Sequence, residues 1–268
     1  MATNQMRREA AKRKLERQRQ RRIERARRRK RIAAITSAAV VVVVVIAVVI
    51  LTTLPSGQED PGTTGDTTTA ALGNCTFTPD GEAPAKPAPV PVSGQVATTG
   101  TQAVQMQTSA GPIGLTLDRS TGPCAVESFI NLTQVGYFDD TPCHRLTTEG
   151  IKVLQCGDPT GQGTGGPGYT INDEPPTHLP PGPTAGTATY PRGTLAMAKT
   201  AAPNSGGSQF FLVYEDSPLP PDYTVFGTVD EAGLATLDKI AAAGDDGSNG
   251  PGDGRPTTQV TIEKVSLI

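Results

Sequence analysis

Hydrophobic and polar residues alternate along much of the chain after about Gln102, and this pattern predicts short β-strands. Residues 104–108 and 113–117 both alternate with a period of two, and Ala110-Gly111-Pro112 has the composition of a turn between them. The pattern therefore predicts a β-hairpin at the start of a mainly β domain. Further strand-like segments occur at residues 195–198, 209–214, 225–229 and 260–265.

Two segments, residues 123–135 and 232–243, repeat their hydrophobic residues with the helical period instead. Pro123 suits the first turn of the first helix, and Ser120 or Thr121 is expected to cap it. Short strands, two helices and glycine-rich connections together suggest a closed antiparallel barrel. The residues expected to face the core are Val126, Phe129, Ile130 and Val135 in the first helix, and Leu234, Leu237 and Ile240 in the second.

A run of 23 residues, 32–54, contains no charged side chain. As a helix that rises about 1.5 Å per residue, it is long enough to cross a bilayer core of about 30 Å. A cleaved signal peptide is the alternative, but its hydrophobic segment is usually no longer than about 15 residues. Residues 54–57, Leu-Pro-Ser-Gly, also make a poor cleavage site. We therefore expect a retained transmembrane signal anchor at residues 32–54.

Charge is distributed unevenly along the chain, although the net charge is only −2. Residues 1–31 contain fifteen Lys and Arg residues against three acidic ones, whereas the rest of the chain is acidic. The positive-inside rule then predicts a cytoplasmic basic arm at 1–31 and an extracytoplasmic position for everything after about Pro55. Anionic lipid headgroups suit this arm. Nucleic acid is not expected as a partner, because no aromatic residue is interleaved for base stacking.

Residues 55–101 are rich in Thr, Pro and Gly, and they predict a disordered linker before a domain at residues 102–268. The proline-rich part, residues 83–91, favours polyproline II. Cys75 interrupts the linker, and a disulfide from it to the domain would shorten the free tether.

All four cysteines lie in the part predicted to be extracytoplasmic, where disulfides are stable. Three pairings are possible, and Cys143 with Cys156 is preferred because these two would flank a hairpin. The alternative is that all four are free and buried as small hydrophobic residues. None has a partner at zinc-ligand spacing, so no metal is expected. The candidate disulfide residues are Cys75, Cys124, Cys143 and Cys156.

Short motifs between residues 128 and 227 follow one another in a distinctive order. The clearest are Gly136-Tyr137-Phe138-Asp139, His144-Arg145-Leu146, Gln155-Cys156-Gly157-Asp158, Gly193-Thr194-Leu195-Ala196-Met197-Ala198 and Gly207-Ser208-Gln209-Phe210-Phe211. In this order they resemble the cyclophilin domain over nearly all of residues 102–268. The resemblance implies a closed eight-stranded barrel capped by two helices, peptidyl-prolyl cis-trans isomerase activity and no cofactor.

The resemblance also implies roles for individual residues. Arg145 would be the catalytic arginine, and Gln155 would hold the substrate backbone. The residues implied to bind substrate are Val153, Phe211 and Leu219 in a proline pocket, Ala198 and Gln209 in the adjoining groove, and Tyr223 at the position of the family's pocket histidine.

Rotation about an X-Pro bond needs no covalent chemistry, only the loss of amide resonance that sets a barrier of about 20 kcal/mol. A donor at the prolyl nitrogen favours the twisted amide, while a hydrophobic pocket holds the ring. Arg145 is always charged and has forked donors, and the Gln155 amide can hold a peptide group. Taken alone, an arginine is more often part of a surface ion pair, and each of the hydrophobic residues is more often part of an ordinary core. The position of Arg145 beside Gln155 on a predicted hairpin favours the site instead.

The sequence departs from the family pattern at the proline pocket. Lys152 stands where the family usually has an aromatic residue, and Tyr223 replaces a histidine. Residues 140–150 run two residues longer than the family's usual turn, so the alternative is that this pocket position shifts by one residue. The chain contains no Trp, whereas the family uses a pocket tryptophan to hold cyclosporin. We therefore expect a shallower and less hydrophobic pocket with an extra positive charge from Lys152, lower activity on small peptides and weak cyclosporin binding.

These features predict a membrane-anchored isomerase that acts on proline-containing segments of exported proteins and assists their folding at the cell envelope. The predicted location is the plasma membrane, crossed once, with the N-terminus cytoplasmic and the isomerase domain outside. One alternative is a catalytically weak peptide-binding or chaperone module on the same fold. Another makes the basic arm the main functional element.

Overall fold

The computed structural model describes residues 71–268. The expected basic arm at 1–31 and the expected anchor at 32–54 lie outside the described residues. Among the described helices, none has the length and hydrophobicity that crossing a membrane requires.

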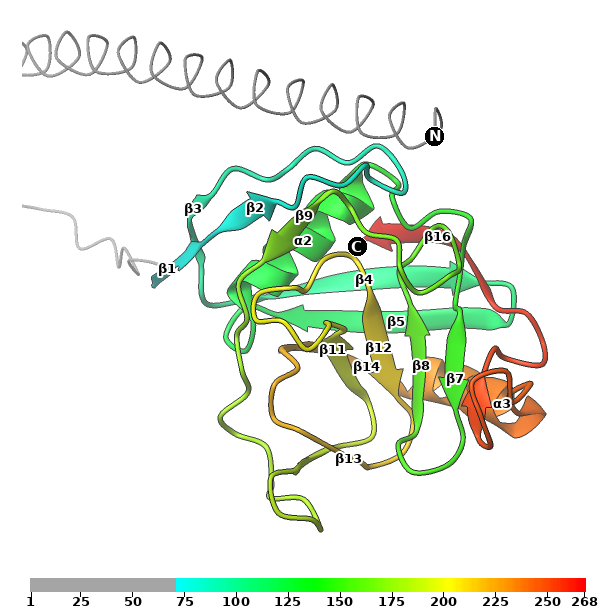
Figure 1. The fold of residues 1–268 in the computed structure, drawn as a ribbon. Coiled ribbons are helices and arrows are strands. Elements are labelled where there is room, and N and C mark those ends of the chain that lie inside the picture. The colour runs from blue at the N-terminus through cyan, green and yellow to red at the C-terminus, as the bar shows by residue number, and fades with distance from the viewer. Residues whose placement is uncertain (1–70) are drawn as a thin grey trace, which may run out of the picture. The chain divides into compact units, whose positions relative to one another are not determined.

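A ten-stranded antiparallel sheet forms most of the domain and curls around a hydrophobic core (Figure 1). The strands follow the order β15-β7-β8-β12-β11-β14-β5-β4-β16-β6 across the sheet. The expected hairpin is β4–β5, whose register pairs Thr108 with Gly111 at the turn. The strands are β4 (Thr101–Thr108), β5 (Gly111–Asp118), β6 (Thr141–Pro142), β7 (Arg145–Thr147), β8 (Val153–Cys156), β11 (Thr194–Met197), β12 (Phe210–Val213), β14 (Val225–Val229), β15 (Asp253–Gly254) and β16 (Thr261–Leu267).

The expectation of a closed eight-stranded barrel is wrong, because the edge strands β6 and β15 are not paired with each other. The reason lies in the short segment that joins β6 to β7. Cys143 donates its backbone N–H to Val260, beside β16, whereas the next residue, His144, donates to Gln155 in β8. The chain therefore changes partner within two residues, and the two ends of the sheet meet through this connection without a continuous ladder.

Two helices, α2 (Pro123–Gln134) and α3 (Glu231–Ala243), cover opposite ends of the curled sheet (Figure 1). The expected inward residues are buried, except that α2 ends at Gln134 and leaves Val135 45% exposed. Neither expected cap serves α2, because its N-cap position is Gly122 and no side chain of that residue is available. Asp230 caps α3 by accepting from the backbone of Gly233, and Gly244 follows its last turn with a positive φ of 83°.

Part of the expected linker is folded against the domain. Residues 71–97, which we call the N-terminal extension, contain β1, β2 and β3, and β2 pairs with β9 of the domain. Phe77 is buried and packs edge-on against Tyr169, with the two ring centroids 6.1 Å apart, so the extension contributes to the core. The extension therefore departs from the expected disordered linker. These strands are β1 (Leu72–Cys75), β2 (Phe77–Pro79), β3 (Gly94–Ala97) and β9 (Tyr169–Ile171).

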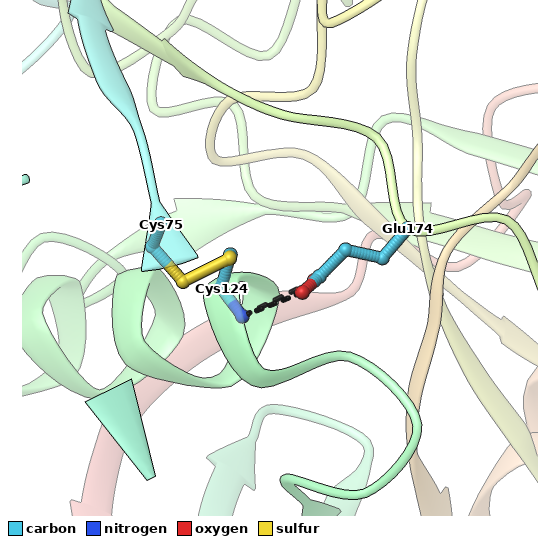
Figure 2. Close-up of side chains that lie close together, drawn as sticks. All are labelled: Cys75, Cys124 and Glu174. Carbon is cyan, nitrogen blue, oxygen red and sulfur yellow. Dashed lines mark hydrogen bonds between the residues drawn. A yellow bond between two sulfur atoms is a disulfide. The ribbon is translucent and has the colours of Figure 1, made fainter. Parts of the chain in front are cut away.

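Two disulfides are present, Cys75–Cys124 and Cys143–Cys156, and the second is the pair that the hairpin pattern favoured. The first joins the extension to the start of α2 (Figure 2). The Glu174 carboxylate lies beside it and accepts the backbone N–H of Cys124 at 3.0 Å, so it serves the helix end that lacks a cap. Within residues 71–268 this is the one cluster of potential metal ligands, and its two sulfur atoms are bonded to each other.

Candidate active site

Arg145 and Gln155 are directly opposite each other on the antiparallel strands β7 and β8. Opposed residues project from the same face of a sheet, so the register brings these two side chains together. The Cys143–Cys156 disulfide joins the residue two positions before Arg145 to the residue that follows Gln155. The sequence motifs around both residues are thus joined into one hairpin by pairing and by a covalent bond.

The Arg145 guanidinium is fixed by a bidentate ion pair with Asp253 of β15. Its Nε donates to Oδ1 at 2.8 Å and its Nη2 donates to Oδ2 at 2.6 Å. Asn249 adds a second donor to Asp253, at 3.1 Å. The Arg145 hydrogen bond lowers the pKa of Asp253, so the carboxylate is ionised near neutral pH. Among the hydrogen bonds of the described residues, none uses Nη1 of Arg145, so this donor is available to a ligand.

Gln155 is oriented by a chain of side-chain amides. Its Nε2 donates to Oε1 of Gln209 at 2.9 Å, and Nε2 of Gln209 donates to the backbone carbonyl of Gly165 at 3.0 Å. Among the hydrogen bonds of the described residues, none uses Oε1 of Gln155. This oxygen is therefore directed as an acceptor for a peptide N–H, which a freely rotating amide would not guarantee.

A hydrophobic cluster separate from the main core forms a pocket beside Arg145. The pocket has a volume of about 170 Å³, and Phe211 forms one wall with Tyr223 edge-on to it at 5.5 Å. The backbone of Tyr223 is fixed by Tyr190, whose hydroxyl donates to the Tyr223 carbonyl at 3.0 Å. The pocket is lined by Arg145, Ile151, Val153, Gln155, Ala198, Lys199, Phe211, Leu219 and Tyr223.

This arrangement collects every residue expected at the site except Gln209, which lines a larger groove next to the pocket. Ala198 borders both spaces, and its backbone N–H donates to the carbonyl of Gln209 at 2.9 Å. Leu219 reaches the pocket from β13 (Ser217–Leu219), which pairs with β10 (Ala188–Tyr190) outside the main sheet. A larger groove thus continues directly from the hydrophobic pocket.

One expected departure from the family pattern is wrong. Lys152 was expected to place a positive charge in the pocket, but its amine donates to the backbone carbonyl of Thr148 in the neighbouring turn. Ile151 lines the pocket instead, because the turn before β8 shifts the inward position by one residue. The pocket is therefore more hydrophobic than the sequence suggested.

Sequence reasoning missed Asp253, the ion-pair partner of Arg145. It lies 108 residues from Arg145 in a loop rich in Gly and Asp, where an acidic residue looks like ordinary surface composition. The pairing of β15 with β7, which joins Asp253 to Thr147, is what brings it to the site.

Comparison with known proteins agrees with this geometry. Residues 103–267 match the family model described as cyclophilin type peptidyl-prolyl cis-trans isomerase/CLD. The chain is 52% identical over 199 residues to the probable peptidyl-prolyl cis-trans isomerase B of Mycobacterium leprae and to that of Mycobacterium tuberculosis. This region is 72% of the chain, and it covers 66% and 64% of these two relatives.

A solved Cryptosporidium parvum cyclophilin type peptidyl-prolyl cis-trans isomerase is similar in structure, with a TM-score of 0.52 and 29% identity. The match covers 63% of this chain and 98% of that one. A second structure of that protein, determined in the presence of the dipeptide Ala-Pro, gives the same TM-score at 30% identity. The family model spans more than half of the chain, so the chain belongs to the cyclophilin-type peptidyl-prolyl cis-trans isomerase family.

Proposed function

We propose that this chain accelerates cis-trans isomerisation of X-Pro bonds, with Arg145 as the catalytic residue. The observation that carries the proposal is the placement of a fixed guanidinium at the rim of a hydrophobic pocket of about 170 Å³. A proline ring held by Phe211 and Leu219 would present its nitrogen to this rim.

The chemistry follows from what each group can do. Nη1 of Arg145 can donate to the prolyl nitrogen as its lone pair leaves the amide resonance, which stabilises the twisted transition state more than either planar form. Oε1 of Gln155 can accept a peptide N–H and hold one side of the bond while the other side rotates. The pocket supplies binding energy and no chemistry, so no cofactor takes part in this scheme.

Replacement of Arg145 tests this proposal in the full chain, purified in mild detergent. Exchange NMR on a proline peptide should show at least a tenfold loss of kcat/KM in Arg145→Ala, equal to about 1.4 kcal/mol of transition-state stabilisation. Arg192→Ala is the matched control, because Arg192 forms a similar bidentate ion pair with Asp238, at 2.7 and 2.8 Å, outside the pocket. Equal rates for wild type and Arg145→Ala would contradict the proposal.

A second candidate function is a catalytically weak peptide-binding or chaperone module. It is favoured by one observation, the absence of tryptophan from the chain, which leaves the pocket with smaller aromatic walls. On this alternative, Arg145→Ala would leave peptide affinity and suppression of aggregation unchanged, and the wild-type isomerisation rate would be near background.

We further propose that the domain lies outside the plasma membrane and acts on proline-containing segments of exported proteins. The uncharged run at 32–54 supports a single membrane crossing, and the basic residues before it support a cytoplasmic N-terminus that contacts anionic lipid headgroups. The two disulfides support an oxidising compartment. Protease added to intact cells should remove the domain and spare an N-terminal fragment; full protection of the domain would contradict this location.

A further inference from the structure

A groove with a volume of about 630 Å³ adjoins the proline pocket. One side of it is formed by Gln155, Ala198 and Gln209, which belong to the candidate active site. Another part of its lining comes from the N-terminal extension, through Asp80, Glu82, Ala83 and Ala85. A peptide whose proline lies in the pocket would therefore run along the extension.

Hydrogen bonds and a disulfide hold the extension in this position. Its β2 pairs with β9, and beyond the strand Asp80 donates its backbone N–H to Gly168 at 3.3 Å. Ala85 donates in the same way to Gly166 at 2.8 Å, and the Cys75–Cys124 disulfide anchors the other end. The segment that receives these bonds also contains Gly165, which accepts the hydrogen bond of Gln209. The wall of the groove and the amide chain of the active site are thus built on the same backbone.

The charges that face the groove differ between its two sides. Lys199 lines the domain side, but it forms an ion pair with Asp173 at 2.6 Å in which the side chains are 13% and 17% exposed. This positive charge is therefore already neutralised. Asp80 and Glu82 are exposed on the extension, and neither is in an ion pair within residues 71–268. The extension's own cation, Lys86, is directed away from them to the backbone carbonyl of Asp139.

We propose that the extension is a specificity wall that favours substrates with a Lys or Arg close to the proline over substrates with an acidic residue there. The inference rests on the proposed isomerase function and names its substrate class. A basic side chain that enters the groove meets two carboxylates without competing cations, whereas an acidic one is repelled. Because the wall is exposed to solvent, its effect depends on ionic strength.

The test uses the full chain and three matched proline peptides that differ only in a residue near the proline: Lys, Glu or norleucine. A second set places the same residues on the other side of the proline, which identifies the flank that meets the wall. We expect kcat/KM to be about three- to tenfold higher for Lys than for Glu on one flank at low salt, and the ratio to shrink at about 0.5 M salt. The Asp80→Asn/Glu82→Gln double variant should bring this ratio close to one.

The matched control is Glu215→Gln/Glu263→Gln, which removes two exposed acidic residues that do not line the groove and should keep the wild-type ratio. An unchanged Lys-to-Glu ratio in the Asp80→Asn/Glu82→Gln variant would overturn the specificity wall. Failure of the isomerase proposal looks different, because wild type would then not accelerate even the norleucine peptide. Peptide affinities measured by NMR titration would still compare Lys with Glu in that case, and equal affinities would overturn the wall.

Discussion

Asp253 positions Arg145, and its removal is expected to slow isomerisation more than it destabilises the fold. In Asp253→Ala the guanidinium loses both acceptors, at 2.8 and 2.6 Å, and keeps only its hydration. Its long side chain then samples several rotamers, so Nη1 faces the pocket for only part of the time. The charge of Arg145 is unchanged, which separates the loss of position from the loss of the donor.

The expected magnitude follows from the exposure of the pair. Truncating one partner of a fully buried ion pair costs about 3–5 kcal/mol. Here the side chains of Arg145 and Asp253 are 35% and 27% exposed, so water replaces part of the lost interaction. We expect a change of about 1 kcal/mol or less in the free energy of unfolding. Disordering of the donor should add about 1–2 kcal/mol to the activation barrier, or a roughly 5- to 30-fold loss of kcat.

Exchange NMR at saturating and subsaturating peptide would separate kcat from KM, with urea unfolding to measure stability. Asp253→Asn should be intermediate, because its amide oxygen can accept one of the two hydrogen bonds. Asp238→Ala is the control that removes a bidentate partner from Arg192, outside the pocket, and it should leave kcat unchanged. Full or increased activity of Asp253→Ala would refute the reasoning, since it would mean that the ion pair does not hold Arg145 in the orientation that isomerisation needs.

Three further predictions concern stability and pH. Replacing Cys75 and Cys124 with serines should lower the unfolding free energy by up to about 4 kcal/mol, because the disulfide closes a loop of 49 residues in the unfolded chain. A loss below about 1 kcal/mol in urea titrations would contradict this prediction. Glu174→Ala should lower the unfolding free energy by about 1–2 kcal/mol, because it removes the acceptor for the backbone N–H groups of Cys124 and Ala125. Burial raises the pKa of Glu174, although these hydrogen bonds lower it, so a charge is costly at this position. The neutral Glu174→Gln should therefore lose less stability in the same titration. Because Arg145 lowers the pKa of Asp253, this ion pair contributes its full stability above an ordinary Asp pKa of about 3.9, and the contribution is lost as pH falls through the lowered folded value. The kcat ratio of wild type to Asp253→Asn should therefore stay constant from about pH 8 to 5. A change in this ratio near pH 6 would contradict the prediction.

Local patterns predicted the elements that depend on local sequence. Alternation at residues 104–108 and 113–117 corresponds to β4 and β5, and the hydrophobic period from Leu234 to Ile240 corresponds to the buried face of α3. The opening of the barrel was not predictable in this way. It depends on β6 and β15, which have two residues each and form only because distant strands offer them hydrogen bonds.

The same distinction explains the site. The motifs around Arg145 and Gln155 could be read from the sequence, because both residues lie in well-defined strands that pair with each other. Asp253 could not, because only its distant pairing gives it a role. The folded extension was hidden for a different reason: its composition is that of a linker, and Cys75 with Phe77 were the only signs that it contacts the domain. The pocket position expected for Lys152 belongs to Ile151, because the turn before β8 is longer than the family's usual turn.

The two disulfides support different parts of the site, and they differ in what else holds those parts. The strands tied by Cys143–Cys156 also pair with each other and with β12 and β15, so the Arg145–Gln155 register has several supports. Besides Cys75–Cys124, the groove-lining part of the extension is held by the three-residue β2–β9 ladder, by two further backbone hydrogen bonds and by the side-chain bonds of Lys86 to Asp139 and of Asn131 to Pro89. A short ladder at a sheet edge opens more readily than a central one. Loss of both disulfides should therefore loosen the wall of the groove while Arg145 and Gln155 stay in register, so that the proposed substrate selectivity depends on an oxidising compartment more strongly than the proposed catalysis does.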